Sequence, residues 1–190
     1  SYSDKLPSVL SDNRKGAYLA GRYLIEHGHK TVALLAGVRS YLSNQERTAG
    51  FLQAFQEEGL SIPPELILET GSWLYDAAEK VCLNFFNTYT GEMPTALFAF
   101  NDRLATGAIN AICKTGRTVP DDVSVIGYDN LGYYNIISPR ITTVETHIEA
   151  ISESTVMHMI WQLNNGSCLP VKVLTPVEVI SGETVRSLLC

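Results

Sequence analysis

The sequence lacks most of the features that would assign it to a functional class at once. It has no run of about 18 apolar residues, and its first residues, SYSDKLPSVL, show neither the basic nor the apolar region of a secretory signal. It contains neither a P-loop nor a G-x-G-x-x-G sequence, and its histidines and carboxylates show no metal-ligand spacing. We therefore expect no membrane span, no cofactor and no metal.

Basic side chains are also scarce. Lys and Arg together number 14 against 20 Asp and Glu, which gives a formal net charge of -6 at pH 7. A surface that binds nucleic acid by itself needs a clustered basic face to neutralise phosphates, and the sequence has no such cluster. The chain alone is therefore not expected to bind DNA.

The cysteines show no motif. Cys82, Cys113, Cys168 and Cys190 are never spaced as Cys-x-x-Cys. We interpret them as reduced side chains that pack as small apolar groups, with a disulfide or a metal site as the alternative.

What the sequence does contain is a regular alternation of strand and helix patterns. Hydrophobic residues make up 45% of the 190 residues, enough for a substantial core. Alternation of this kind, with glycines after the helices, is typical of parallel α/β architecture. Predicted strands cover 8–11, 31–36, 66–69, 95–100, 123–127, 141–144, 171–174 and 177–181, and predicted helices cover 14–27, 45–58, 76–87, the residues between Asn101 and Gly116, and 147–164.

Residues 94–130 form the most informative unit. The apolar strand 95–100 is followed directly by Asn101, whose side chain can cap the next helix, and strand 123–127 is followed by Asp129. Because ligands collect at the carboxyl ends of strands in an open parallel sheet, Asn101 and Asp129 are candidate site residues.

This unit resembles the effector-binding domain of the lactose-repressor (LacI/GalR) family of bacterial transcription regulators. The shared pattern is a strand, Asn-Asp, a helix, Gly, Val-Pro-Asp-Asp and then Val-Ile-Gly-Tyr-Asp, and it occurs here with the same order and spacing. Further matching segments are GRYLIEHGHKTVALLAG (21–37), ERTAGFLQAFQEEGL (46–60), ETGSW (69–73) and PRITTV (139–144).

The resemblance implies an α/β fold of the periplasmic-binding-protein-like type I, in which two Rossmann-like lobes with parallel sheets flanked by helices enclose a ligand. On this pattern residues 1–30 and 146–169 would be a remnant of the N-terminal lobe. Residues 31–145 and 170–190 would form the C-terminal lobe. We expect the N-terminal lobe to be incomplete and the helix-turn-helix headpiece to be absent.

The resemblance also implies four ligand-binding residues, Arg47, Trp73, Asn101 and Asp129, each matching the family's residue at its position. A guanidinium and a carboxylate can each hold two neighbouring hydroxyls, and an aromatic face can cover the apolar side of a sugar ring. The expected ligand is a sugar or a sugar derivative.

Each of these residues also has a purely structural interpretation. Arg47 could be a solvated helix residue paired with Glu46 or Asp76, and Trp73 could pack in the core. Asn101 could serve only as a helix cap, and Asp129 only as a turn residue.

Four further positions are candidates for selecting the ligand. Tyr41 and Ser43 lie where family members vary, and Tyr41 could stack on a sugar or lie on the surface. Lys15 stands where some relatives carry an acidic residue, and Thr146 where many carry Gln. A lysine near the cleft would leave room for a phosphorylated sugar.

The function implied is effector sensing, in which a ligand rearranges two lobes and thereby controls operator binding through a headpiece. A cytoplasmic homodimer is expected, with Tyr133, Ile136 and Ile137 as possible contacts. A transport-type sugar-binding protein of the same fold is the alternative. An enzyme using Asp129 is a remote one, because no partner acid, base or metal motif accompanies that residue.

Overall fold

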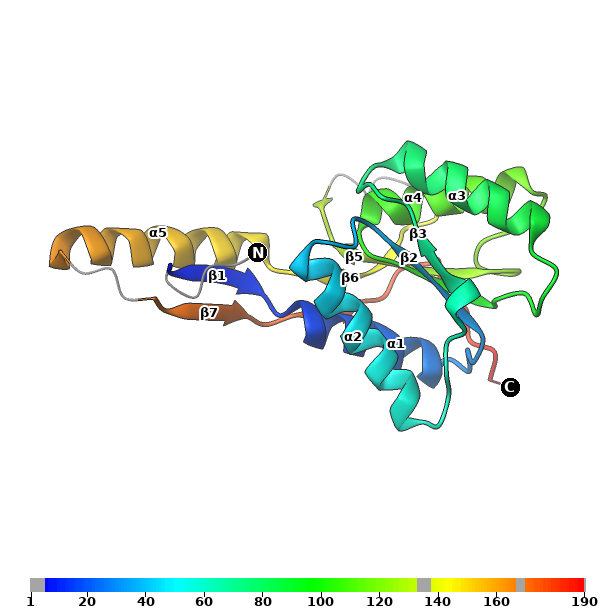
Figure 1. Ribbon diagram of the computed structural model, residues 1–190, viewed down its shortest axis with the longest axis horizontal. Coiled ribbons are helices and arrows are strands. Elements are labelled where there is room, and N and C mark those ends of the chain that lie inside the picture. Colours follow the sequence, from blue (N-terminus) through cyan, green and yellow to red (C-terminus); the bar gives the residue numbers. More distant parts are fainter. Residues whose placement is uncertain (1–5, 133–137, 167–169, 190) are drawn as a thin grey trace.

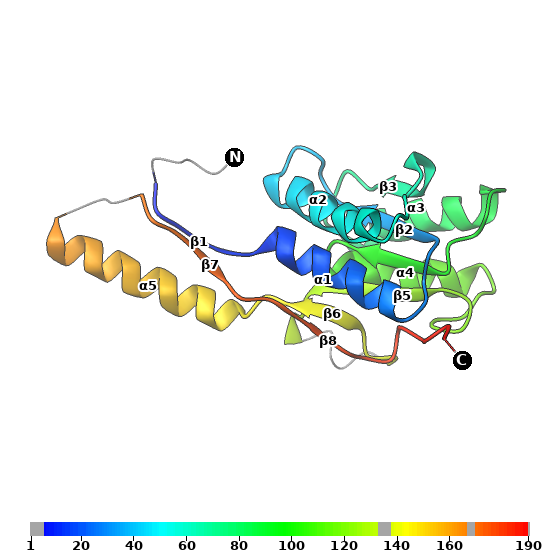
Figure 2. The same ribbon diagram turned by 90° about the horizontal axis from the view of Figure 1, so that it is seen from below.

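The computed structural model describes residues 6–132, 138–166 and 170–189, and the chain has two parts (Figure 1). The first, here called the sheet lobe, contains a six-stranded sheet, its covering helices and one short 3-10 turn, η1 (Pro64–Leu66). The second, here called the arm, contains β1 (Ser8–Ser11), β7 (Lys172–Thr175) and α5 (Ile148–Asn165), and it extends away from the lobe in both views (Figures 1 and 2).

The strands of the sheet lobe lie in the order β3-β2-β4-β5-β6-β8. The first five are parallel, and β8 pairs antiparallel with β6 at one edge. Their bounds are β2 (Val32–Ala36), β3 (Ile67–Glu69), β4 (Ala96–Ala99), β5 (Ser124–Asp129), β6 (Thr142–Glu145) and β8 (Glu178–Ile180).

Helices cover both faces of this sheet. Helices α1 and α2 pack together on one face, and α3 and α4 pack together on the other (Figures 1 and 2). The bounds are α1 (Asn13–Glu26), α2 (Leu42–Glu57), α3 (Tyr75–Thr88) and α4 (Asp102–Lys114). The result is a three-layer α/β lobe in which the central strands β2 and β4 are buried on both sides.

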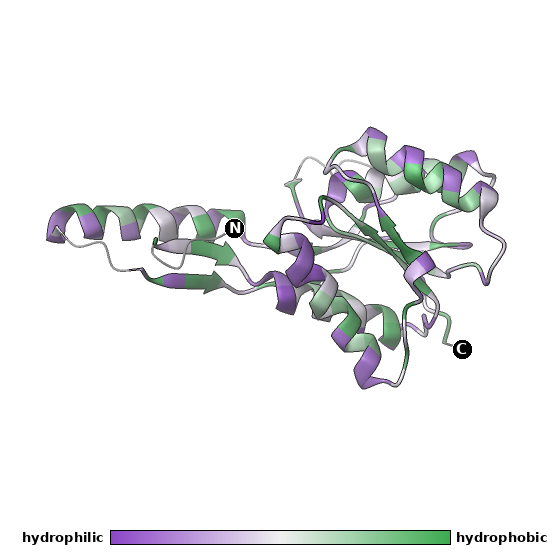
Figure 3. Ribbon diagram, in the orientation of Figure 1, coloured by the Kyte–Doolittle hydropathy of each residue, from purple (hydrophilic) through white to green (hydrophobic). Residues whose placement is uncertain are grey.

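The core of the sheet lobe follows from this layering. Every residue of β2 and β4 is buried, as expected for central parallel strands. Rings from the sheet and from α2 stack in the interior, with the Phe51 centroid 4.8 Å from that of Phe98 and 5.0 Å from that of Phe55. Hydropathy colouring shows apolar strands between helices of mixed character (Figure 3).

Local sequence signals fix where several helices begin and end. The side chain of Asp12 accepts a hydrogen bond from the Lys15 backbone N at 2.9 Å and so caps α1. After α1, Gly28 has φ +87°, a conformation that glycine adopts without steric cost. Helix α2 begins at Leu42, earlier than the predicted residue 45. Asn44 does not cap it, because its Oδ1 accepts from the backbone N of Gly37 instead.

The position of helix α1 shows that part of the predicted division into lobes is wrong. Residues 1–30 were expected in the N-terminal lobe, but α1 packs on α2 and contributes to the core of the sheet lobe. Small residues allow this close approach. A Cβ on Gly50 would collide with the carbonyl oxygen of Arg14, and a Cβ on Gly21 would lie 2.8 Å from that of Ala54.

Strand β7 also departs from the expected division. Residues 170–190 were expected in the C-terminal lobe, and β8 does pair within the large sheet. Strand β7, however, pairs in parallel with β1, from Ser8 opposite Lys172 to Ser11 opposite Thr175. The two strands leave the lobe together because Pro176 separates β7 from β8.

Candidate ligand-binding site

The candidate site lies at the carboxyl ends of the parallel strands, where the connections diverge. From β2 the chain passes to β3 on one side and then crosses to β4 on the other. In open α/β sheets ligands bind in the crevice outside such a switch point. Arg47 lies in α2, which follows β2, and Asn101 directly follows β4, so the two residues come from opposite sides of the crevice.

Arg47 is buried, with 7% of its surface exposed, and its guanidinium is held on every side. Its Nε donates to Asn13 Oδ1 at 2.9 Å, and Nη1 donates to the carbonyl oxygen of Phe100. Its Nη2 lies 3.2 Å from Asp129 Oδ1. The guanidinium carbon also lies 3.6 Å from the centre of the Tyr128 ring. The interpretation of Arg47 as a solvated residue paired with Glu46 or Asp76 is therefore wrong.

Asn101 has both a structural contact and a position at the cavity. Its Oδ1 accepts a hydrogen bond from the Leu104 backbone N at 2.7 Å, which confirms that it caps α4. Its Nδ2 donates to the carbonyl oxygen of Trp73 at 3.3 Å. Asn101 thus also fixes the loop that carries the indole.

Trp73 is partly buried and packs against the core, and its indole lies over the backbone of Gly37. A Cβ placed on Gly37 would lie 2.6 Å from Trp73 Cε3, so only glycine permits the contact. The Tyr41 ring stands 6.1 Å from that of Trp73 at 31°, and Tyr41 is 54% exposed. The two rings form an aromatic border, of which Trp73 lines the cavity and Tyr41 does not.

These side chains surround an open cavity of about 240 Å³. A guanidinium carries five N–H donors, and its contacts with the described residues named above account for three of them. The cavity combines this guanidinium with a carboxylate, an amide and an indole, which suits a small polar ligand. Its lining residues are Ser43, Arg47, Trp73, Asn101 and Asp129.

Asp129 has an unusual backbone for a carboxylate-bearing residue. Its φ is +101° and that of Asn130 is +52°, both in the left-handed region that is costly for residues other than glycine. Burial raises the pKa of the Asp129 carboxyl, and the charge and hydrogen bond of Arg47 oppose that rise. Asp129 is thus the last residue of β5, at the point where the chain turns, and its side chain also belongs to the site.

Thr146 and Lys15 take different places from those expected of ligand contacts. Thr146 is buried, and its hydroxyl lies 3.2 Å from the carbonyl oxygen of Asp129, so it contacts the backbone of the turn. Lys15 lines a separate hollow with Arg14, Tyr18 and other residues, and its Nζ is 5.1 Å from the Tyr18 ring centre. The structure therefore does not bring Lys15 to the cavity.

Two residues of the site were not anticipated from the sequence. Asn13, in the first turn of α1, accepts the Nε–H of Arg47. Asp102 is buried, and its two oxygens accept from Thr143 Oγ1 at 2.6 Å and from the Leu131 backbone N at 3.1 Å. Burial raises the pKa of Asp102 to about 7. Its position beside Asn101 was the one available signal.

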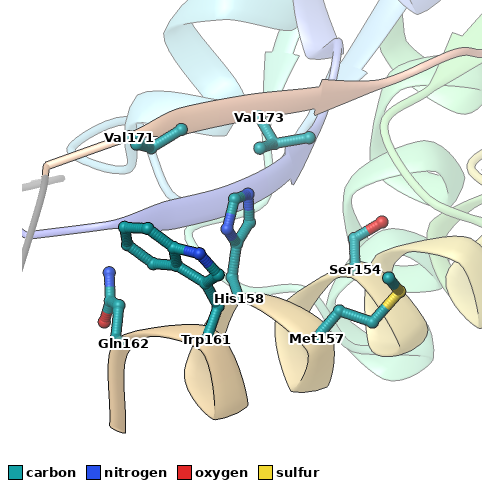
Figure 4. A pocket seen from close by; sticks show the side chains of 7 residues that line it. All are labelled: Ser154, Met157, His158, Trp161, Gln162, Val171 and Val173. Atoms are coloured by element: carbon teal, nitrogen blue, oxygen red, sulfur yellow. The ribbon is translucent and has the colours of Figure 1, made fainter. Parts of the chain in front are cut away.

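A larger hollow, of about 510 Å³, lies in the arm and not at this site. Figure 4 shows Met157, His158 and Trp161 of α5 on one side and Val171 and Val173 on the other. Its lining carries no cluster of charged groups that could orient a polar ligand. We interpret it as incompletely covered packing between α5 and the neighbouring strands.

Among the residues that the structure describes, no group of three or more His, Cys, Asp or Glu side chains could hold a metal ion. In the same residues no helix is both long and apolar enough to cross a lipid bilayer. The expected dimer contacts Tyr133, Ile136 and Ile137 lie outside the described residues.

Comparison with known proteins agrees with the fold and with the sequence pattern. The family model of the periplasmic binding protein-like domain matches residues 22–185. The chain is 31% identical over 189 residues to the Probable HTH-type transcriptional repressor ExuR of Bacillus subtilis, covering 96% of this chain and 54% of the relative. It therefore spans about half the length of that curated relative.

Solved structures show the same likeness. A transcriptional regulator LacI from Bacillus cereus subsp. cytotoxis superposes with a TM-score of 0.90 at 25% identity, covering 98% of this chain and 66% of that one. The lac repressor dimer bound to operator and the anti-inducer ONPF gives a TM-score of 0.86 at 27% identity, covering 97% and 55% respectively. The chain thus belongs to the periplasmic-binding-protein-like domain family, in the form found in LacI-family transcriptional regulators.

Proposed function

We propose that this chain is the effector-binding part of a LacI-type transcriptional repressor and that its cavity binds a sugar or a sugar derivative. The observation that carries the proposal is the convergence of Arg47, Asn101 and Asp129 beside the Trp73 indole at the switch point of the sheet. A buried guanidinium next to a carboxylate can bind vicinal hydroxyls. The indole offers a face to the C–H side of a sugar ring.

We assign the selection of the ligand to Tyr41 and Ser43. Ser43 lines the cavity, and Tyr41 extends the aromatic border from an exposed position where a ligand could order it. Lys15 is set apart from the cavity, which favours a neutral sugar over a phosphorylated one.

We further propose that the arm belongs to a second lobe and that the ligand lies between the two lobes. No residue of α5 is buried, although the helix carries Val156, Met159 and Leu163 among its exposed apolar side chains. Exposed apolar area of this extent supports a covering layer elsewhere in a longer protein.

Operator binding belongs, in this proposal, to a part of the protein outside the chain. The matched lac repressor structure is a dimer on its operator, which supports homodimerisation and a DNA-binding headpiece for the longer protein. The net charge of -6 supports the same division, because the chain has no basic cluster for phosphate contacts. We propose a cytoplasmic regulator without catalytic activity, in keeping with its repressor relatives.

Isothermal titration calorimetry on the full-length protein tests the ligand proposal. The panel consists of glucose, galactose, cellobiose, glucose 6-phosphate and hypoxanthine. We expect saturable binding of one of the neutral sugars, and we expect Asp129→Asn to weaken it at least about tenfold, since a hydrogen bond to a charged group contributes about 1.5–3 kcal/mol. Binding of hypoxanthine alone, or binding that Asp129→Asn leaves unchanged, would contradict the proposal.

A further inference from the structure

The backbone of the described chain is strained at one junction between the sheet lobe and the arm. Asp129, Asn130 and His147 are the non-glycine residues with positive φ in residues 6–132, 138–166 and 170–189. Asp129 is the last residue of β5 and Asn130 follows it, so the two form the turn at the end of this strand. His147, at φ +51°, lies between β6 and α5. Such conformations are unfavourable for residues other than glycine and persist where surrounding contacts hold them.

Glu145 supplies contacts to both strained segments. One carboxylate oxygen, Oε2, accepts a hydrogen bond from Asn130 Nδ2. The other, Oε1, accepts from the His147 backbone N at 2.6 Å. A single side chain therefore connects the turn that carries Asp129 to the residue from which α5 departs.

Neighbouring contacts close the same junction. Glu145 lies in register with Asp129 on β5 and with Glu178 on β8. The hydroxyl of Thr146 lies 3.2 Å from the carbonyl oxygen of Asp129, and His147 Nε2 lies 3.4 Å from Glu178 Oε1. Hydrogen bonds and strand pairing thus connect the Asp129 turn, the residues at the end of β6 and the start of β8.

We propose that Glu145 is a positioning residue that couples the Asp129 turn to the direction in which α5 leaves the sheet lobe. Movement of the Asp129 turn is passed through Asn130 to the Glu145 carboxylate and from there to the His147 backbone. The positive φ angles at Asn130 and His147 are unfavourable by themselves and are held by hydrogen bonds to Glu145. A change in the conformation of one segment therefore alters the hydrogen bond that holds the other. The role as a switch rests on the proposed function, because that function makes Asp129 a ligand contact.

Distance measurement between two spin labels tests this coupling without any ligand. One label is placed on the exposed native Cys113 of α4 and the other on Leu163→Cys near the end of α5, in a background with Cys168→Ser and Cys190→Ser. Cys82 is buried and stays unlabelled. Double electron–electron resonance then reports the distance from the sheet lobe to the arm.

We expect Glu145→Gln, which keeps the size of the side chain, and Glu145→Ala to broaden or shift the distance distribution. Asp129→Ala is expected to change the distribution when Glu145 is present and to add nothing in the Glu145→Gln protein, which is the non-additivity expected of coupled residues. Glu149→Gln, in the exposed first turn of α5, makes the same charge change as a matched control and should leave the distribution unchanged.

The proposal is overturned if both Glu145 variants keep the wild-type distribution, or if Asp129→Ala has the same effect with and without Glu145. Circular dichroism confirms folding of each variant, and the isosteric Glu145→Gln remains decisive if Glu145→Ala does not fold. The distance measurement uses no ligand. Absence of sugar binding in the calorimetry would therefore refute the proposed function, while the distance distributions would still test the coupling through Glu145.

Discussion

Strand β4 in the sheet lobe and helix α5 in the arm are both rich in apolar side chains, yet they lie in opposite surroundings. Each residue of β4 is buried, whereas no residue of α5 is. The difference arises because β4 has a strand on each side and helices over both faces, while α5 packs against β1 and has no buried residue. Apolar composition therefore stabilises a segment only when a second layer covers it.

The largest expected contrast between the two parts comes from one substitution made in both. Leu104→Ala in α4 removes a fully buried side chain and should lower the free energy of unfolding by about 2–5 kcal/mol. Leu163→Ala in α5 removes a side chain that is 76% exposed and should change it by less than about 0.5 kcal/mol. Urea unfolding of both variants measures the contrast, and equal losses would show that the arm is covered in solution.

A second prediction concerns the pH dependence of the sheet lobe. The pKa of Asp102 rises from 3.8 to about 7 on burial, so the folded state binds its proton more tightly than the unfolded state does. The stability from this group is present below about pH 4 and is lost as pH rises through about 7, with a total on the order of a few kcal/mol.

Asp102→Asn removes this titration. The free energy of unfolding of the wild type and of the variant is compared from pH 4 to pH 8. As pH rises, the value for the wild type should fall relative to that of the variant. A difference that does not vary over this range would show that the environment of Asp102 does not favour its protonated form.

A third prediction tests the close approach of α1 and α2, which joins α1 to the sheet lobe. Gly50→Ala should lower stability by about 1–3 kcal/mol, because the new Cβ meets the backbone carbonyl of Arg14, which cannot rotate away. Gly132→Ala is the control, since no atom of the described residues lies within 4 Å of its added Cβ. Thermal unfolding measures both, and equal melting temperatures would contradict the packing described for α1.

The smallest expected effect concerns Lys15, which lines the hollow that also contains Arg14 and Tyr18 and does not line the cavity. Lys15→Ala should change the affinity for a neutral sugar by less than about twofold, because the side chain is exposed and lines a different hollow. Calorimetry compares it with Asp129→Asn. A large loss with Lys15→Ala would place this residue in the ligand site and would favour a phosphorylated ligand.

The sequence predicted the order and most of the bounds of the elements, because strand runs, caps and glycine stops act within a few residues. The prediction that Arg47, Trp73, Asn101 and Asp129 belong together came from family resemblance, and the structure brings these side chains to one cavity. Asn13 and Asp102 were missed. Asparagine and aspartate are common in the first turn of a helix, so the sequence alone does not reveal which groups these two side chains contact.

The sequence by itself determined the secondary structure of this protein and the strand ends at which polar residues stand, since hydrophobic period, capping and turn chemistry are local properties. Only the tertiary structure decided that α1 joins the sheet lobe, that β7 pairs with β1, and that Glu145 connects two strained segments. These outcomes depend on which surfaces meet across long separations in the chain. A local sequence pattern does not predict which surfaces contact each other, because these contacts depend on packing and hydrogen bonds between residues far apart in the chain.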